Sequence, residues 1–259
     1  MSEPTYPEPR DLLRGKTVVV TAAAGTGIGY AVARRAAEEG ATVLISDHHA
    51  RRLEEAADRL AGETGRPRPL TCPCDVTQQD QIDHLHAFAI TELGHVDVLI
   101  NNAGYGSEVP VVEITDSEWN RVFDVTLGSV FRMSRAFLPA MYARRQGTIV
   151  NNASVLGWRA QKGQAHYAAA KAGVMAFTRC AALEAAEHEV RINAVSPSLV
   201  VHPFLTKAVS AETIAELEAA EAFGRSAKAW EVANVMIFLA SDLSSYMTGE
   251  VVSVSSQRG

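Results

Sequence analysis

The chain has 259 residues, of which 47% are hydrophobic and 21% charged, a composition that is ordinary for a soluble globular protein. Its formal net charge is -6, and with no run of lysines or arginines this argues against a nucleic-acid partner. No apolar run reaches the roughly 18 residues of a membrane span, and the first residues carry no signal peptide, so we predict a cytoplasmic protein without membrane contact.

Short β-branched runs alternate with longer helical patterns along the chain. In chain order we predict strand Thr17–Thr21, helix Ile28–Glu39, strand Thr42–Ser46, helix Ala50–Ala61, strand Pro69–Cys74, helix Gln78–Glu92, strand Val96–Asn101, helix Asp116–Arg144, strand Gly147–Asn151, a helix from about Tyr167 to Glu187, strand Arg191–Val195, helix Val232–Leu239 and strand Glu250–Val254. Apolar strands separated by helices predict a parallel sheet covered on both faces. Right-handed crossovers make it a Rossmann-type doubly wound α/β sheet of about seven strands.

The pattern predicts one domain, residues 14–259, after a flexible, proline-rich arm at residues 1–13. The stretch Pro197–Ser226 breaks the alternation and is predicted to be mobile. The three cysteines, Cys72, Cys74 and Cys180, are too few for a disulfide framework, and Cys72-Pro-Cys74 lacks the spacing of a redox or zinc pair. We interpret them as small core residues in a reducing compartment and predict no metal site.

A glycine-rich turn, Ala22-Ala-Ala-Gly25-Thr26-Gly27-Ile28-Gly29, joins the first strand to the first helix. Such a turn lets the backbone approach a pyrophosphate at the helix N-terminus. The acidic residue expected about 20 residues further on is Asp47. Its carboxylate can accept ribose hydroxyls and opposes a 2′-phosphate, which favours NAD over NADP. Two alternatives stay open: Asp47 could cap the next helix, and the nearby cations His48, Arg51 and Arg52 could offset its charge.

Tyr167-Ala-Ala-Ala-Lys171 is the stretch that most directly indicates chemistry. Positions i and i+4 of a helix share one face. A nearby cation stabilises a phenolate and lowers a tyrosine pKa from its ordinary value near 10. Ser154 adds a hydroxyl that can donate to a substrate oxygen while Tyr167 transfers a proton. This set predicts the interconversion of a carbonyl and an alcohol.

Several motifs in one order resemble those of the classical short-chain dehydrogenase/reductases from about residue 13 onward. The matching residues are Gly27-Ile28-Gly29, Asp75-Val76, Asn101-Asn102-Ala103-Gly104, Ser154, Tyr167, Lys171, Asn193-Ala194-Val195-Ser196-Pro197 and Met247-Thr248-Gly249. The resemblance implies an NAD(P)-dependent oxidoreductase with Tyr167 as general acid or base, Lys171 on the nicotinamide ribose and Ser154 on the substrate oxygen. It also implies a substrate lid at about residues 198–226, and a homotetramer formed through the two long helices.

The turn and the family motifs together imply cofactor contacts from Ala23, Gly25, Thr26, Gly27, Ile28, Asp47, Asp75, Val76, Asn102, Ala103, Gly104, Tyr167, Lys171, Pro197, Val200 and His202. Substrate contacts are expected from Ser154, Leu156, Tyr167 and His202. His202 could meet the pyrophosphate or a substrate carboxylate or thioester, or simply pack as a loop histidine. His166, beside Tyr167, is predicted to lie on the surface.

The sequence departs from the family pattern at several positions. Ala23 replaces the first glycine, and Thr126 replaces the asparagine that normally helps a water reach the active-site lysine. A threonine hydroxyl could still hold a water. Pro197-Ser198 replaces Pro-Gly, His202 replaces a threonine that contacts nicotinamide, and Ser255-Ser256-Gln257 replaces Asp-Gly-Gly. These differences indicate an outlying subgroup.

Apolar residues in the lid and after Ser154 favour a bulky hydrophobic ketone or secondary alcohol over a sugar. They are Leu199, Val200, Val201, Pro203, Phe204, Leu205, Val155, Leu156 and Trp158. The glycine turn and serine-rich ending look similar to short-chain dehydrogenases of actinobacterial steroid-ring degradation, whose substrates are coenzyme A thioesters. One alternative is a 3-ketoacyl-thioester reductase. The other, from a different class, is a non-catalytic dinucleotide-binding regulatory protein, which Thr126 favours and the intact Ser154, Tyr167 and Lys171 oppose.

Overall fold

The structure is a computed structural model that describes residues 4–201 and 210–256. Within these residues, seven parallel strands form one sheet in the order β3-β2-β1-β4-β5-β6-β7. The order reverses between β1 and β4, as in a doubly wound sheet, and the carboxyl ends at such a point form the usual ligand crevice of this architecture. The predicted fold class is therefore confirmed.

The strands are β1 (Thr17–Thr21), β2 (Thr42–Asp47), β3 (Leu70–Pro73), β4 (Val98–Asn101), β5 (Gly147–Asn152), β6 (Val190–Pro197) and β7 (Val251–Val254). The α-helices are α1 (Ile28–Glu38), α2 (Ala50–Thr64), α3 (Gln79–Leu93), α4 (Asp116–Phe123), α5 (Ser129–Arg144), α6 (Ala165–Ala186), α8 (Ala211–Ala220) and α9 (Ala229–Ala240). Short helical turns include η2 (Asp124–Gly128), η3 (Val155–Gly157) and η4 (Asp242–Ser244).

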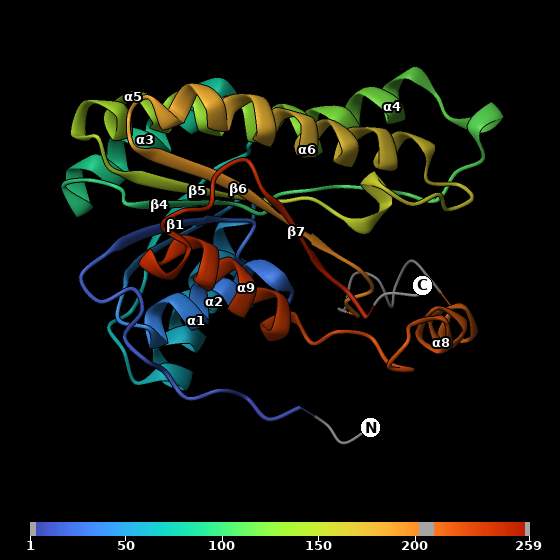
Figure 1. Ribbon diagram of the computed structural model, residues 1–259, viewed down its shortest axis with the longest axis horizontal. Coiled ribbons are helices and arrows are strands. Elements are labelled where there is room, and N and C mark those ends of the chain that lie inside the picture. The colour runs from blue at the N-terminus through green and yellow to red at the C-terminus, as the bar shows by residue number, and fades with distance from the viewer. Residues whose placement is uncertain (1–3, 202–209, 257–259) are drawn as a thin grey trace.

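Helices cover both faces of the sheet, with α1, α2 and α9 on one side and α3, α4, α5 and α6 on the other (Figure 1). Strand β1 shows why the strands read as continuous apolar runs. Val18 and Val20 pack into the core on one side, and Val19 packs into the core on the other. Because both faces of a central parallel strand are covered, no position on it needs a polar residue.

The long helix predicted over Asp116–Arg144 is divided by η2, a π-helical turn at Asp124–Gly128. The division rests on backbone hydrogen bonds over a single turn, which were not inferred from the apolar pattern, so it was not predicted. A π-helical turn often marks a functional site. In the expected lid, the structure adds α8, which begins after the N-cap Ser210, whose side chain accepts from the amide of Thr213. His202, Pro203, Phe204 and Leu205 lie outside the described residues.

The N-terminal arm, predicted to be flexible, makes specific contacts with α1 and the residue after it from Tyr6 onward. The Arg35 guanidinium donates to the carbonyl oxygens of Pro7 and Glu8 at 2.8 and 3.1 Å. The Glu39 carboxylate accepts from the amides of Arg10 and Leu12, both at 2.9 Å. These partners satisfy the backbone of an arm that lacks secondary structure of its own. Because they come from a helix more than twenty residues away, the local composition of the arm does not reveal them.

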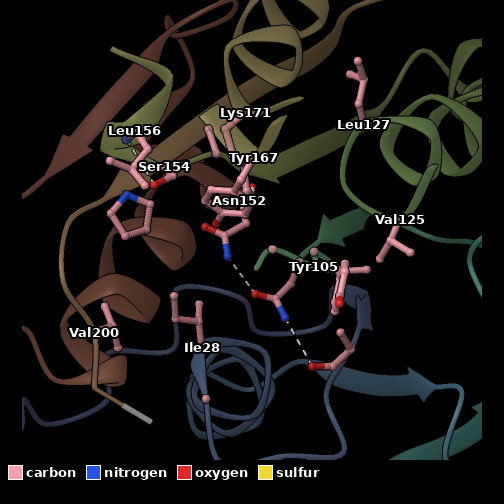
Figure 2. Close-up of a pocket in the computed structure, with 18 of the residues that line it drawn as sticks. Ile28, Tyr105, Val125, Leu127, Asn152, Ser154, Leu156, Tyr167, Lys171 and Val200 are labelled. Carbon is pink, nitrogen blue, oxygen red and sulfur yellow. Dashed lines mark hydrogen bonds between the residues drawn. The ribbon is translucent and has the colours of Figure 1, made fainter. Parts of the chain in front are cut away.

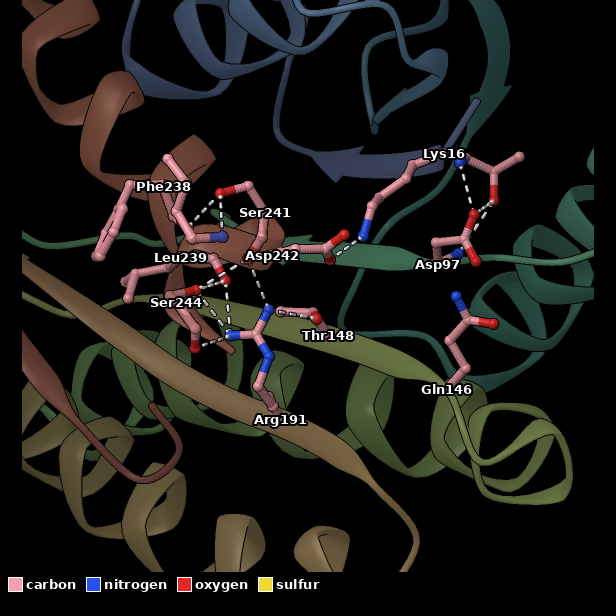
Figure 3. A network of polar contacts seen from close by, with 12 residues as sticks. Lys16, Asp97, Gln146, Thr148, Arg191, Phe238, Leu239, Ser241, Asp242 and Ser244 are labelled. Carbon is pink, nitrogen blue, oxygen red and sulfur yellow. Dashed lines mark hydrogen bonds and ion pairs between the residues drawn. The ribbon is translucent and has the colours of Figure 1, made fainter. Parts of the chain in front are cut away.

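At the amino ends of β5 and β6, a half-buried arginine joins the sheet to the end of α9 (Figure 3). Arg191 donates to the carbonyl oxygens of Leu239, Ser241 and Ser244 at 3.0 to 3.1 Å, and to the hydroxyl of Thr148 at 3.1 Å. A cation is well placed there because the last carbonyls of a helix lack partners and carry partial negative charge. These hydrogen bonds hold this edge of the sheet in place. The candidate site lies at the opposite edge.

Among the residues that the structure describes, no helix combines the length and the apolar character needed to cross a bilayer.

Candidate active site

A cleft of about 1900 Å³ lies along the carboxyl ends of the strands, and loops after six of the strands line it together with α8. Most predicted site residues face it: Gly25, Gly27, Ile28, Asp47, Asp75, Val76, Asn102, Ala103, Gly104, Ser154, Leu156, Tyr167, Lys171, Pro197 and Val200. Three do not line it. Ala23 is fully buried, Thr126 lies buried behind Tyr105, and Thr26 stands outside the lining. His202 is outside the described residues.

The structure brings Ser154, Tyr167 and Lys171 together (Figure 2). Tyr167 and Lys171 come from the first two turns of α6, one helical turn apart, as their spacing predicts. Ser154 follows β5 and is the N-cap of η3, where its Oγ accepts from the amide of Leu156 at 3.2 Å. Lys171 is only 2% exposed, and its Nζ donates to the carbonyl oxygen of Asn152 at 2.5 Å.

The two titratable groups of this set are both shifted toward their uncharged forms. Burial raises the pKa of Tyr167 to about 12, and the hydrogen bond with Ser154 acts in the opposite direction. Burial lowers the pKa of Lys171 to about 8, so the ammonium remains charged at neutral pH. The Tyr–Lys spacing predicted a lowered tyrosine pKa, but the protein alone gives the reverse. Lys171 Nζ is 5.6 Å from the centre of the Tyr167 ring and turns toward Asn152, so desolvation dominates.

The nucleotide end of the cleft is built around the turn after β1. Gly29 has no room for a side chain, because a Cβ would lie 2.4 Å from the carbonyl oxygen of Ala22 and 2.5 Å from Asn102 Nδ2. At Gly27, by contrast, a Cβ would meet nothing within 4 Å. The turn is therefore tightly packed at Gly29 and open at Gly27. The open side fits a pyrophosphate that approaches the amides of the turn.

Asp47 ends β2 and supports this turn. Its Oδ2 accepts from the amide of Ala24 at 3.2 Å, and its Oδ1 accepts from the amide of His49 at 3.1 Å. The N-cap position of α2 is His49, so the helix-cap interpretation of Asp47 does not hold. The carboxylate faces the cleft and fits the ribose of a dinucleotide. His48 lies beside it, with Nδ1 at 3.3 Å from Asp47 Oδ1.

A line of hydrogen-bonded asparagines that was not predicted connects the glycine turn with Lys171. Asn102 Nδ2 donates to the carbonyl oxygens of Thr21 and Ala22, both at 3.2 Å, and its Oδ1 accepts from Asn152 Nδ2 at 2.9 Å. The carbonyl oxygen of Asn152 in turn accepts from Lys171. The contact between Asn152 and Lys171 was missed because the backbone carbonyl of Asn152 makes it, and any residue type has one.

The structure gives Thr126 a role other than holding a water for the active-site lysine, which was considered from the sequence. It is fully buried in η2, and its Oγ1 donates to the carbonyl oxygen of Tyr105 at 2.9 Å and accepts from the amide of Tyr105 at 3.1 Å. Since a hydroxyl has one proton to donate, its donor is already used, and Thr126 does not reach the cleft with it. The side chain instead fixes the backbone of the loop after β4.

Replacing Thr126 by valine should therefore weaken the fold as well as activity. Valine keeps the shape but leaves the amide and carbonyl of Tyr105 without their partner, which costs about 1–3 kcal/mol. We expect this loss in the free energy of unfolding measured by urea denaturation, together with a lower kcat. Thr126→Ser retains the hydroxyl and is the control. Equal stability of the valine and serine variants would contradict this role.

Two predictions about single side chains were wrong. His166 was expected on the surface but is fully buried, because α4 packs against the side of α6 that carries it. Its Nε2 lies 3.0 Å from Ser107 Oγ. Cys180 was expected in the core but is exposed on α6, whereas Cys72 and Cys74 are buried as predicted.

Comparison with known proteins agrees with this geometry. Residues 22–256 match the family model described as enoyl-(acyl carrier protein) reductase. A protein of Mycobacterium tuberculosis (strain ATCC 25618 / H37Rv), named (5R,7aS)-5-hydroxy-7a-methyl-1-oxo-2,3,5,6,7,7a-hexahydro-1H-indene-carboxyl-CoA reductase, is 61% identical over 247 residues, or 95% of this chain and 94% of that protein. The 3-oxoacyl-(acyl-carrier-protein) reductase FabG of Thermotoga maritima is 37% identical over 93% of this chain and 97% of its own length.

Among solved structures, a short chain dehydrogenase from Mycobacterium smegmatis is 55% identical and superposes with a TM-score of 0.88, covering 100% of this chain and 99% of that one. The ordered motifs, the sheet with its cleft and these relatives all agree. The chain belongs to the classical short-chain dehydrogenase/reductases, a family of oxidoreductases.

Proposed function

We propose that the protein interconverts a ketone and a secondary alcohol on a bulky hydrophobic coenzyme A thioester, with NAD(H) as cofactor. The observation that carries this proposal is the convergence of Ser154, Tyr167 and Lys171 on a cleft whose other end holds the glycine turn and Asp47. Small-molecule sites usually measure about 300–1,000 Å³. The cleft of about 1900 Å³ leaves room for a dinucleotide and a large second molecule together.

In the reductive direction, the residues divide the work by position. Ser154 holds the substrate carbonyl oxygen by donating its hydroxyl hydrogen, and Tyr167, which hydrogen-bonds with Ser154, gives that oxygen a proton as it gains charge. When bound, the dinucleotide supplies the hydride. Lys171 stays charged near neutral pH and places a cation behind the phenol, which favours its loss of a proton. In the oxidative direction the same groups act in reverse.

The substrate class is supported by the wall of the cleft and by one relative. Val155, Leu156, Val200 and Leu217 contribute apolar surface around the catalytic residues. The relative from Mycobacterium tuberculosis, 61% identical, is named for a fused-ring carboxyl-CoA ester. We infer that the present protein takes a related, steroid-derived ring thioester.

A 3-ketoacyl-thioester reductase is the second candidate. It is favoured by the FabG of Thermotoga maritima, which is 37% identical over almost the whole chain. A regulatory protein without turnover is the third, from a different class. It is opposed by the convergence of Ser154, Tyr167 and Lys171 on one cleft, since Ser154 is expected to contact the substrate and is not needed for dinucleotide binding alone.

An activity panel tests the choice. Purified protein is assayed with NADH or NAD and with ring-ketone CoA esters, linear 3-ketoacyl-CoA esters and free steroid ketones. We expect kcat/KM to be highest for the ring-ketone CoA esters. Preference for linear esters would select the second candidate, and no turnover on any substrate would select the third.

Replacing Asp47 by serine should change the choice of cofactor. The variant loses a charge that opposes a 2′-phosphate and a carboxylate that accepts from ribose hydroxyls. We expect the ratio of NADH to NADPH affinity, measured by fluorescence titration, to fall by at least about tenfold, since one charged hydrogen bond is worth about 1.5–3 kcal/mol. Asp58→Ser, an exposed aspartate on α2, is the control. A wild-type protein that binds NADPH more tightly would overturn the NAD assignment.

We further propose that the protein is cytoplasmic and forms a homotetramer through the helices α4, α5 and α6. Phe131 on α5 and Leu183 on α6 support this assembly, because they are 45% and 74% exposed and would be covered in it. Light scattering after size exclusion should give a mass four times the 27.8 kDa of one chain. A monomeric mass would contradict the proposal.

A further inference from the structure

Four consecutive residues after β4, Gly104 to Ser107, lie directly against the catalytic neighbourhood; we refer to them as the 104–107 segment. A Cβ on Gly104 would be 3.3 Å from Lys171 Nζ, and a Cβ on Gly106 would be 2.6 Å from the Tyr167 ring. The backbone of Tyr105 is bound on both sides by Thr126. The segment is therefore the wall that the Tyr167 ring rests on, and its position limits where the phenol can be.

Ser107 fixes the far end of this segment through two partners on different helices. Its Oγ donates to the carboxylate of Glu118 on α4 and lies 3.0 Å from Nε2 of His166 on α6. Because the serine has a single hydroxyl hydrogen, which goes to Glu118, it accepts from His166. The imidazole therefore carries its hydrogen on Nε2.

His166 gives the second, independent observation. It is fully buried, and within the described residues its Nδ1 has no hydrogen-bond partner. An unsatisfied buried polar atom is destabilising, and an apolar side chain of similar size would avoid that cost. The bond to Ser107 is what a histidine provides here and an apolar residue does not. His166 also directly precedes Tyr167, so whatever holds it holds the same turn of α6.

We propose that His166, Ser107 and Glu118 form a hydrogen-bonded chain, the Glu118–Ser107–His166 clamp, that positions Tyr167 for proton transfer. All three are positioning residues, because they act through the 104–107 segment and through the first turn of α6. The proposal rests on the proposed function, since it assigns the clamp to the proton-transfer step. Proton-transfer geometry is sensitive to displacement, and a shift of about 1 Å can cost about 10²-fold in rate.

The test compares Ser107→Ala, which breaks the clamp, with Ser107→Thr, which keeps the hydroxyl. Ser117→Ala, on an exposed position of α4, is the matched control. With the best substrate of the activity panel, we expect Ser107→Ala to lower kcat by about 10- to 100-fold. The dissociation constant for NADH should stay close to that of the wild type, whereas the thermal midpoint should fall, because the buried Nε2–H of His166 loses its acceptor. Ser107→Thr should recover most of kcat, and Ser117→Ala should match the wild type.

Hydrogen exchange of backbone amides adds a readout that does not depend on turnover. In Ser107→Ala we expect the amides of residues 105–107 to exchange at least about tenfold faster, while those of β1 do not change. Unchanged exchange would overturn the clamp, and faster exchange with an unchanged kcat would overturn its effect on catalysis. The wild-type protein could also prove inert to every substrate while amide exchange is still faster in Ser107→Ala. That result would support the clamp and overturn the proposed function. Loss of kcat with an equal loss of NADH binding would also overturn the proposal, because the effect would then be general.

Discussion

Replacing Tyr167 by phenylalanine is expected to lower kcat by about 10³-fold or more while leaving NADH binding nearly unchanged. In the proposed function the phenol gives the proton to the carbonyl oxygen, and general acid–base catalysis by one side chain contributes about 10²–10⁴-fold. Phenylalanine keeps the ring that packs on Gly106, so the cleft should keep its shape. The measurements are kcat with a ketone thioester and a fluorescence titration with NADH.

Tyr105→Phe is the matched control, because Tyr105 lines the same cleft but its ring stacks on Arg121 rather than on the catalytic residues. It should keep most of kcat. If Tyr167→Phe retained more than about a tenth of the wild-type kcat, the proton donor would have to be another group.

The same tyrosine sets a pH dependence whose sign differs between the two directions. Burial raises the pKa of Tyr167 to about 12, so the phenol is protonated at neutral pH. Reduction uses the neutral phenol and should be fully supported at pH 7, then fall as the pH rises through the phenol pKa. Oxidation uses the phenolate and should rise with pH over the same range. In Tyr167→Phe both dependences should disappear from the residual rate.

Replacing Lys171 by methionine should abolish turnover. It should nevertheless leave the free energy of unfolding unchanged or higher below about pH 8. Burial lowers the pKa of this 2% exposed lysine from 10.5 to about 8, which corresponds to about 3 kcal/mol against the charged form in the folded protein. Below pH 8 the folded chain bears this cost. The unpaired carbonyl oxygen of Asn152 offsets part of the gain, at about 1–3 kcal/mol. At pH 7 the variant should therefore equal or exceed the wild type in stability.

The dependence of stability on pH separates the cost of burying the charged lysine from the cost of the unpaired Asn152 carbonyl. Between pH 8 and 10.5 the unfolded wild type binds more protons at this lysine than the folded protein, so its free energy of unfolding should rise with pH, by up to about 1.4 kcal/mol per pH unit from this group. Lys171→Met lacks that rise. Urea denaturation at pH 7, 8, 9 and 10 measures it as the difference between the wild type and the variant, because Cys74, whose pKa burial raises to about 12, acts in the opposite sense in both proteins. Lys162→Met, at an exposed position before α6, is the control and should keep the rise.

The strands and the proximity of Tyr167 to Lys171 were predictable because each depends on a short local pattern. β-branched runs mark strands that are buried on both faces, and a spacing of four places Tyr167 and Lys171 on one side of a helix wherever that helix lies. The glycine turn and Asp47 follow from the order of the first two strands. In each case, the carboxyl edge of a parallel sheet brings the pieces together without further information.

The features that escaped prediction all depend on packing between distant segments. His166 lies away from Tyr167 on the helix, as expected, but only the position of α4 decides that this side is covered. The partners of Thr126 and Ser107 come from another part of the chain, and nothing in the local composition indicates them. The arm appeared flexible from its sequence because its partners, Arg35 on α1 and Glu39 just after α1, lie far away in the chain.

The line of hydrogen-bonded asparagines, Asn102 and Asn152, has a consequence for anyone who redesigns this protein. Asp47 stands at one end of the cleft, and its carboxylate accepts from the amides of Ala24 in the turn and of His49 beside it, so preference between the two dinucleotides can be altered there without disturbing the lysine. Asn102 is tied at once to the turn and, through Asn152, to the lysine. Substitutions at Asn102 should therefore affect the glycine turn and the position of Lys171 together. Cofactor preference is easier to change at Asp47 than at Asn102.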